Sequence, residues 1–258
     1  MAIAAPLVAS RRQMPADPLR ARTMANRRRG LALVVASAVP LGVAVGLLVL
    51  FLSSWPYGIA GLVVGTLLLG VVMWWAAEPL ARRVLGGAPA KSFEHARLLN
   101  LVEGLSATIG TYPPEVRVRP ETTLNAAVCG RRRRRATLVA TQGLLDELNR
   151  MELEGVVAQL LTRARTHDML PATVTVATLG IGATLLSPPE PVTAMDRAAV
   201  SFTRYPPGLI SALEKMGAKG TEVRGASRAS AHLWFAPASG STAPITPLKD
   251  RIEALREL

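Results

Sequence analysis

Two long runs without a charged residue constrain this chain more than any other feature. Residues 31–53 and 57–77 contain no Asp, Glu, Lys or Arg. At about 1.5 Å per residue, a helix formed by either run is long enough to cross a hydrocarbon core of roughly 30 Å. The sequence therefore predicts a two-helix transmembrane anchor at 31–77 and excludes a wholly soluble protein. A cleaved signal peptide is disfavoured, because the first run is too long and a second run follows at once.

The charges on either side of these runs predict the orientation. Residues 1–30 hold seven arginines against one acidic residue, Asp17, and the short connection between the runs is uncharged. Arg82, Arg83 and Lys91 follow the second run. Lys and Arg are retained on the cytoplasmic side of a membrane. We therefore expect a protein of the inner (plasma) membrane, with a basic N-terminal segment (1–30) and a C-terminal domain (78–258) in the cytoplasm.

The third part, residues 78–258, has the length of one domain and is predicted to be α+β, mainly helical with a small antiparallel sheet. Alternating side chains and flanking prolines favour strands, and apolar residues three and four apart favour helices. The expected strands are 115–119, 124–128 and 136–140, and the expected helices are 92–109, 141–148, 150–168, 206–216 and 248–258. The single cysteine, Cys129, excludes an intrachain disulfide.

The predicted helix at 151–168 carries the most information. Its apolar residues recur at helical spacing and predict a single buried stripe: Leu153, Val156, Val157, Leu160, Leu161 and Ala164. Gln159 and Arg163 lie four residues apart, beside that stripe, and face the same way.

Residues 152–158, followed by Asp168, resemble the active-site helix of the HtpX-type membrane zinc metallopeptidases, which are relatives of the CAAX prenyl proteases. Further segments resemble the family in the same order: 124–126, 140–145, 196–200, 203–213 and 247–258. The resemblance covers nearly everything after Glu78 and implies a gluzincin-like peptidase domain behind the membrane anchor.

The zinc motif of that family is missing here. In the family, His-Glu-x-x-His supplies two zinc ligands and a general base, and a downstream Glu completes the ligand set. The resemblance places Gln159 and Arg163 at the two histidine positions, Leu160 at the general base and Val192 at the third ligand. An amide is a poor zinc ligand, a guanidinium repels the cation, and leucine accepts no proton.

We therefore expect no metal, no cofactor and no catalytic residue, and we interpret the chain as a pseudopeptidase. The alternative is an active membrane zinc metalloendopeptidase that serves membrane-protein quality control and requires zinc. Glu190 would reach the third ligand position only if the register there shifts by two residues.

The expected binding residues are Asn125, Ala126, Arg163 and Asp196. Arg163 replaces the charge of the lost dication if it pairs with Asp196 or Glu190, and otherwise it points to solvent. The strand at 124–126 resembles the family's edge strand, which predicts a groove that binds a peptide by strand addition. The expected partner is a membrane protein or peptide, and a purely structural membrane subunit is the other possibility.

A run of five arginines separates the second and third predicted strands. Near a membrane, such a patch attracts anionic lipid, although a solvated turn is the commoner fate of a charge run. Nucleic acid is disfavoured, because only 11 aromatic residues are present and no stacking platform emerges. The predicted lipid-facing patch comprises Arg131, Arg132, Arg133, Arg134 and Arg135.

Residues 169–186 are also uncharged, but proline, glycine and threonine weaken them as a membrane span. A single crossing would separate Asp196 from the helix at 151–168 by a bilayer. We therefore expect an interfacial helix, a re-entrant hairpin or burial under the domain, and no third crossing.

Overall fold

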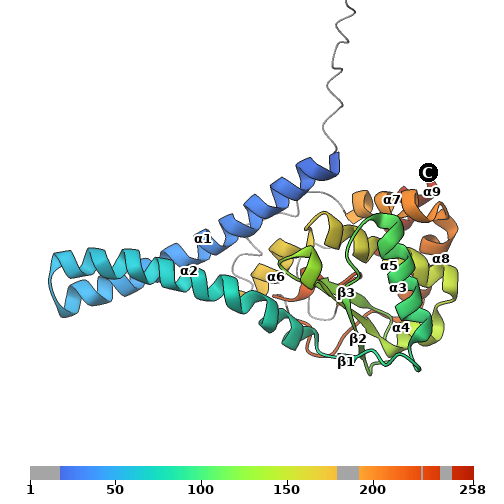
Figure 1. Ribbon diagram of the computed structural model, residues 1–258, viewed down its shortest axis with the longest axis horizontal. Helices are drawn as coiled ribbons and strands as arrows, with labels where there is room; N and C mark the ends of the chain where they lie inside the picture. Colours follow the sequence, from blue (N-terminus) through green and yellow to red (C-terminus); the bar gives the residue numbers. More distant parts are fainter. Residues whose placement is uncertain (1–17, 179–191, 228, 239–245) are drawn as a thin grey trace, which may run out of the picture.

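The computed structural model describes residues 18–178, 192–227, 229–238 and 246–258. Helices α1 (Pro18–Leu52) and α2 (Trp55–Leu85) form an antiparallel hairpin that projects from one side of the domain (Figure 1). Ser53 and Ser54 make the turn, and Pro56 lies in the first turn of α2, where its missing N–H leaves no bond unmade. Both helices extend beyond the uncharged runs on the side of the domain.

Small residues hold the two helices of the hairpin together. A Cβ added to Gly42 would collide with Thr66, and one added to Gly46 would collide with Leu62. Close packing of this kind is the usual basis of helix association in a bilayer, where lipid removes the hydrophobic driving force. Large apolar side chains such as Phe51 and Leu67 point outward and are 87% and 64% exposed.

Both helices are long and apolar enough to span a membrane, and the most apolar part of α2 is not buried in the protein. The predicted N-terminal helical hairpin is confirmed.

The small sheet is mixed, so the antiparallel arrangement predicted from the sequence is wrong. Its strands are β1 (Ala88–Pro89), β2 (Glu115–Arg119), β3 (Ala126–Cys129) and β4 (Thr137–Thr141), in the spatial order β1-β2-β4-β3. The hairpin of β3 and β4 is antiparallel, but β4 inserts next to β2 and runs parallel to it. The crossover at 120–125 lets β4 occupy the centre of the sheet, where all five of its residues are buried.

Seven helices cover and surround this sheet in the described part of the domain: α3 (Ala96–Ile109), α4 (Gln142–Glu147), α5 (Arg150–Arg165), α6 (Met169–Ala177), α7 (Val192–Thr203), α8 (Pro206–Lys219) and α9 (Leu248–Arg256). Short 3-10 turns lie at Arg133–Arg135 and Ala231–Leu233. The α+β class and most helix positions agree with the prediction.

Helix α5 lies at the centre of the domain, in contact with α3, β3, α7 and α8. It is buried on nearly all sides, including Gln159, Thr162 and Arg163, so the prediction of a single buried stripe is wrong. Gly155 allows this enclosure, because a Cβ there would lie 3.0 Å from the backbone of Leu209 in α8.

The first half of the segment at 169–186 forms helix α6. Leu170 and Val174 pack against Leu33 of α1 and Ala77 of α2, while Ala172 and Val176 pack against the inner end of α2 and the sheet. Residues 169–177 are therefore buried between hairpin and domain, one of the expected arrangements, and residues 179–191 lie outside the described part of the chain.

Candidate functional site

The start of α5 is fixed by a capping box. The side chain of Asn149 accepts a hydrogen bond from the backbone of Glu152, whose carboxylate accepts one from the backbone of Asn149. The same carboxylate accepts hydrogen bonds from Ser211 (2.6 Å) and Lys215 (2.8 Å) of α8. Burial alone would raise the pKa of Glu152, but the hydrogen bonds from Lys215 and Ser211 lower it. Helix α5 is thereby anchored to α8 about two turns before the candidate site.

Arg163 is buried and fully engaged. Its Nε donates to Oδ2 of Asp168 at 3.0 Å, and its two terminal nitrogens donate to the backbone carbonyls of Leu233 (3.2 Å) and His232 (2.6 Å). The residue is 7% exposed. The expectation of a solvated helix end is therefore wrong, and Arg163 does pair with a carboxylate.

That carboxylate is not the one predicted. Asp196 of α7 accepts two hydrogen bonds, each 2.8 Å long, from Arg251 of α9, and both side chains are completely buried. Arg251 also donates to the carbonyl of Phe235 at 2.7 Å and stacks over its ring. The prediction of an Arg163–Asp196 pair fails because α7 turns Asp196 toward α9, where an arginine closer to it takes up both oxygens. Glu190 lies outside the described residues.

Comparison with known proteins finds relatives that match most of the chain. It is 28% identical to the "Protease HtpX homolog" of Thermoanaerobacter pseudethanolicus, over 83% of this chain and 90% of that protein. The protein of the same name from Dictyoglomus thermophilum is also 28% identical, over 79% of this chain and 84% of its own length. These matches support the resemblance of the chain to the HtpX-type family.

No family model and no solved structure matches. A relative from Bacteroides fragilis is 29% identical over 51% of this chain and 40% of its own length. The HtpX-type relatives and the two apolar helices together identify a membrane protein.

The residues at the HtpX-type zinc positions do not fit a zinc ion. The interior of α5 presents the amide of Gln159, the aliphatic side chain of Leu160 and the guanidinium of Arg163. Val192, assigned to the third ligand, is the first residue of α7 and has no donor atom in its side chain. In the described part of the chain, no three His, Cys, Asp or Glu side chains gather in a group that would hold a metal.

Gln159 is buried with a side-chain oxygen that has no hydrogen-bond partner among the described residues. The residue is 1% exposed, and the oxygen is Oε1. Leu160, its neighbour, is completely buried in the main hydrophobic core. A carboxylate at position 160 would therefore have to be accommodated among apolar neighbours.

The predicted peptide-binding edge is occupied by the chain itself. The backbone N–H of Phe235 donates to the carbonyl of Ala126 at 2.7 Å, and Trp234 bridges Ala127. The side chain of Asn125 exchanges hydrogen bonds with the backbone of Ala236. Asn125 and Ala126 are 0% and 1% exposed, so residues 234–236 occupy the place that a bound strand would take.

The five arginines do not form one surface. Arg131 turns inward, with its Nε 3.5 Å from Glu78 and its guanidinium over the rings of Trp74 and Trp75. Arg134 donates to the hydroxyl of Tyr112 at 2.9 Å. Arg132 and Arg135 are exposed, while Arg133 reaches toward α1 and His167.

Sequence reasoning missed the buried Arg251 and the contact of Arg27 with His167. Arg251 sits on an amphipathic helix among other charged residues, and nothing in that pattern marks it as the buried one. Asp168, five residues beyond Arg163, carried a signal, because the resemblance to the HtpX-type active-site helix includes it.

Proposed function

We propose that this protein is a membrane-anchored pseudopeptidase, a domain of HtpX-type ancestry that does not hydrolyse peptide bonds and acts by binding a partner at the membrane. The proposal rests on the position and the contacts of Arg163. A permanently charged guanidinium stands where the resemblance expects a zinc ligand, and it is held there by Asp168 and two carbonyls.

The electrostatics of that position oppose a metal ion. Two unit charges about 4 Å apart interact by about 4 kcal/mol at an effective dielectric constant of about 20, and a dication doubles the repulsion. Arginine cannot relieve it by losing its proton. The general-base position supports the same proposal, since Leu160 cannot activate a water molecule.

The partner proposal follows from the membrane anchor and the closed edge. Because residues 234–236 already pair with β3, a partner strand would bind there only after displacing them. We therefore propose that the partner is another membrane protein that contacts the outer surfaces of the hairpin and domain. In this proposal the domain lies in the cytoplasm, as the arginines before α1 and after α2 favour.

The test measures metal content and proteolysis in the purified full-length protein. After equilibration with zinc and removal of the excess, we expect far less than one zinc per chain and no chelator-sensitive cleavage of casein. The HtpX homolog of Thermoanaerobacter pseudethanolicus, carried through the same purification, is the positive control.

A second control distinguishes this chain from a contaminant. The variants Gln159→Ala and Arg163→Ala should leave any residual cleavage unchanged. Stoichiometric zinc with cleavage that Gln159→Ala abolishes would refute the proposal and establish the active membrane metalloendopeptidase instead.

A further inference from the structure

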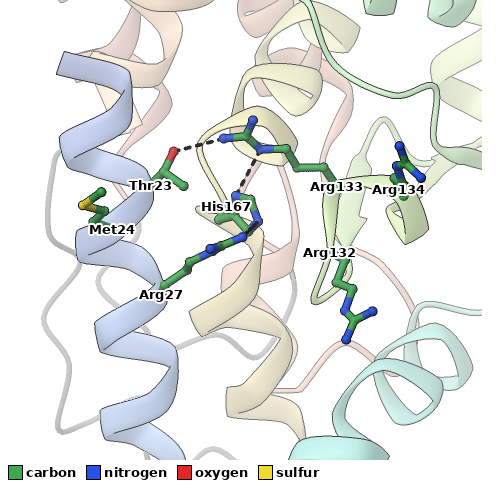
Figure 2. Close-up of a pocket in the computed structure, with 7 residues that line it drawn as sticks. All are labelled: Thr23, Met24, Arg27, Arg132, Arg133, Arg134 and His167. Atoms are coloured by element: carbon green, nitrogen blue, oxygen red, sulfur yellow. Dashed lines mark hydrogen bonds between the residues drawn. The ribbon is translucent and has the colours of Figure 1, made fainter. Parts of the chain in front are cut away.

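A cavity of about 480 Å³ lies where the inner end of α1 meets the domain. Helix α1 contributes one wall, the turn between β3 and β4 another, and the connection from α5 to α6 the floor (Figure 2). Its lining residues are Thr23, Met24, Arg27, Arg132, Arg133, Arg134 and His167.

Two arginines from distant parts of the chain converge on one imidazole. The Nε of Arg133 donates to Nδ1 of His167 at 3.2 Å, and a terminal nitrogen of Arg133 donates to the hydroxyl of Thr23 at 3.2 Å. A terminal nitrogen of Arg27 lies 3.5 Å from the other ring nitrogen, Nε2. Figure 2 shows both guanidinium groups directed at His167, whereas those of Arg132 and Arg134 extend away from the ring.

Arg27 and Arg133 bring N–H groups to both nitrogens of this imidazole. A neutral imidazole has one N–H and one acceptor nitrogen. If Nδ1 accepts from Arg133, the proton of the ring is on Nε2, next to the N–H groups of Arg27. Two donors that face each other leave a place for an acceptor, and an anion oxygen would receive a hydrogen bond from each.

The charges point the same way. No carboxylate is among the residues that line this cavity in the described chain. Burial, and then the charges of Arg133 and Arg27, lower the pKa of His167 to about 4, so the ring is neutral near pH 7. Burial, with Arg165 and Arg27, also lowers the pKa of Arg133. An anion would reduce this repulsion between like charges.

The backbone at His167 supports a built site. The residue is 3% exposed and has φ of 57°, a left-handed conformation that side chains other than glycine adopt at a cost. Such strain persists where the surroundings determine the conformation, and it is frequent at binding sites. Here it turns the ring toward α1.

The residues around the cavity favour a position at the depth of the lipid headgroups. Arg27 precedes Leu31, the first residue of the uncharged run, by four residues, which is about 6 Å along a helix. Trp74 and Trp75 of α2, which carry Arg131 over their rings, are of the type that gathers at a membrane interface. A basic pocket between membrane helices and the domain is positioned to meet lipid phosphates.

We propose that this cavity binds the phosphate group of an anionic membrane lipid, held by the guanidinium groups of Arg27 and Arg133 and by the Nε2–H of His167. Guanidinium–phosphate contacts are charge-assisted and directional, and two arginines from separate elements fix the group between them. A bound lipid would thereby join α1 to the β3–β4 turn. A free phosphate ion would make the same contacts, so the experiment below also measures the binding of inorganic phosphate, which distinguishes a lipid phosphate from a free one.

The experiment uses the full-length protein in detergent. Affinity for a short-chain phosphatidylglycerol is obtained from the rise of the melting temperature with lipid concentration, and native mass spectrometry counts the bound lipid. Phosphatidylcholine of equal chain length and inorganic phosphate are the comparison ligands.

The site variant is Arg27→Gln with Arg133→Gln. Its matched control is Arg28→Gln with Arg135→Gln, which removes the same charge from the same two elements at exposed residues outside the cavity. Arg27→Gln alone is a further variant, which we expect to fold like the unmodified protein because Arg27 is exposed.

We expect phosphatidylglycerol to bind the site variant at least about tenfold more weakly than the unmodified protein, and the control pair to differ by less than about twofold. Phosphatidylcholine should bind much more weakly than phosphatidylglycerol. Equal losses in both pairs, or equal affinity for the two lipids, would overturn the proposal. Arginine-dependent binding of inorganic phosphate without binding of phosphatidylglycerol would overturn the lipid as the source.

Discussion

The buried pair of Asp196 and Arg251 gives the sharpest stability prediction. Both side chains are completely buried, and three hydrogen bonds from the guanidinium join α9 to α7 and to the carbonyl of Phe235. Replacing Arg251 by methionine keeps much of the volume but removes the charge and every donor. Asp196 then remains buried without its partner, and the Phe235 carbonyl loses a donor.

The cost follows from what is left behind. Removing one partner of a buried ion pair destabilises a protein by about 3–5 kcal/mol, because the remaining charge is neither solvated nor paired. For a chain of this size, each kcal/mol lowers the melting temperature by about 2–4 °C, so Arg251→Met should lower it by about 6–20 °C. Removing both partners with Asp196→Leu and Arg251→Met should recover more than half of the loss, since no charge is then left unpaired.

The assay is thermal unfolding in detergent, followed by near-UV circular dichroism. Arg256→Met is the matched control: it lies on the same helix, and its ion pair with Glu214 is exposed, with side chains 63% and 48% accessible. An exposed pair contributes at most about 1 kcal/mol. The reasoning would be refuted if Arg251→Met and Arg256→Met had the same melting temperature, or if the double variant were less stable than Arg251→Met.

Three further predictions concern Arg163, His167 and the topology. Arg163→Met should lower the free energy of unfolding by about 2 kcal/mol, which is less than for Arg251→Met because Asp168 is partly exposed. The same variant should speed hydrogen exchange at the amide of Phe235, and an unchanged exchange rate would contradict this prediction. The pKa of His167 is held near 4, below its usual 6.5, so the free energy of unfolding should fall as the pH drops from 6.5 toward 4, by about 2 kcal/mol at pH 5. In thermal melts measured across this pH range, His167→Asn should lack this loss of stability. An impermeant thiol reagent should label Ser54→Cys from outside the cell and Leu258→Cys only after permeabilisation. Labelling of Leu258→Cys from outside would show that the predicted orientation of the C-terminal domain is wrong. Native Cys129 should not interfere, because burial raises its pKa to about 12.

Elements with local signals were predicted well from the sequence. Strand β2 has the predicted bounds, Glu115–Arg119, because prolines close both ends of an alternating segment. Helix α8 begins at Pro206, as its pair of prolines indicated, and the hairpin follows from the two uncharged runs. In each case a few neighbouring residues carry the information.

Features that depend on distant partners were not predicted. The parallel pairing of β2 with β4 reflects where the β3–β4 hairpin docks, which no local pattern encodes. Helix α5 reads as amphipathic because Gln159, Thr162 and Arg163 are polar, yet all three are buried. Thr162 bonds to the carbonyl of Ala158 in its own helix, and Arg163 bonds to the 232–233 backbone, so their burial depends on partners rather than on hydropathy.

The contacts of Arg163 connect the two departures from a peptidase site. Its guanidinium holds the carbonyls of His232 and Leu233, and the residues that follow directly, 234–236, pair with the edge of β3. The side chain of Arg163 and the segment along the edge of β3 are therefore parts of one hydrogen-bonded unit. A histidine at position 163 would be shorter and would carry too few donors for these carbonyls and Asp168 together. Arg163 thus stands at the position that the resemblance assigns to a metal ligand and also fixes the segment that pairs with β3, so under the proposed function the two features are physically coupled.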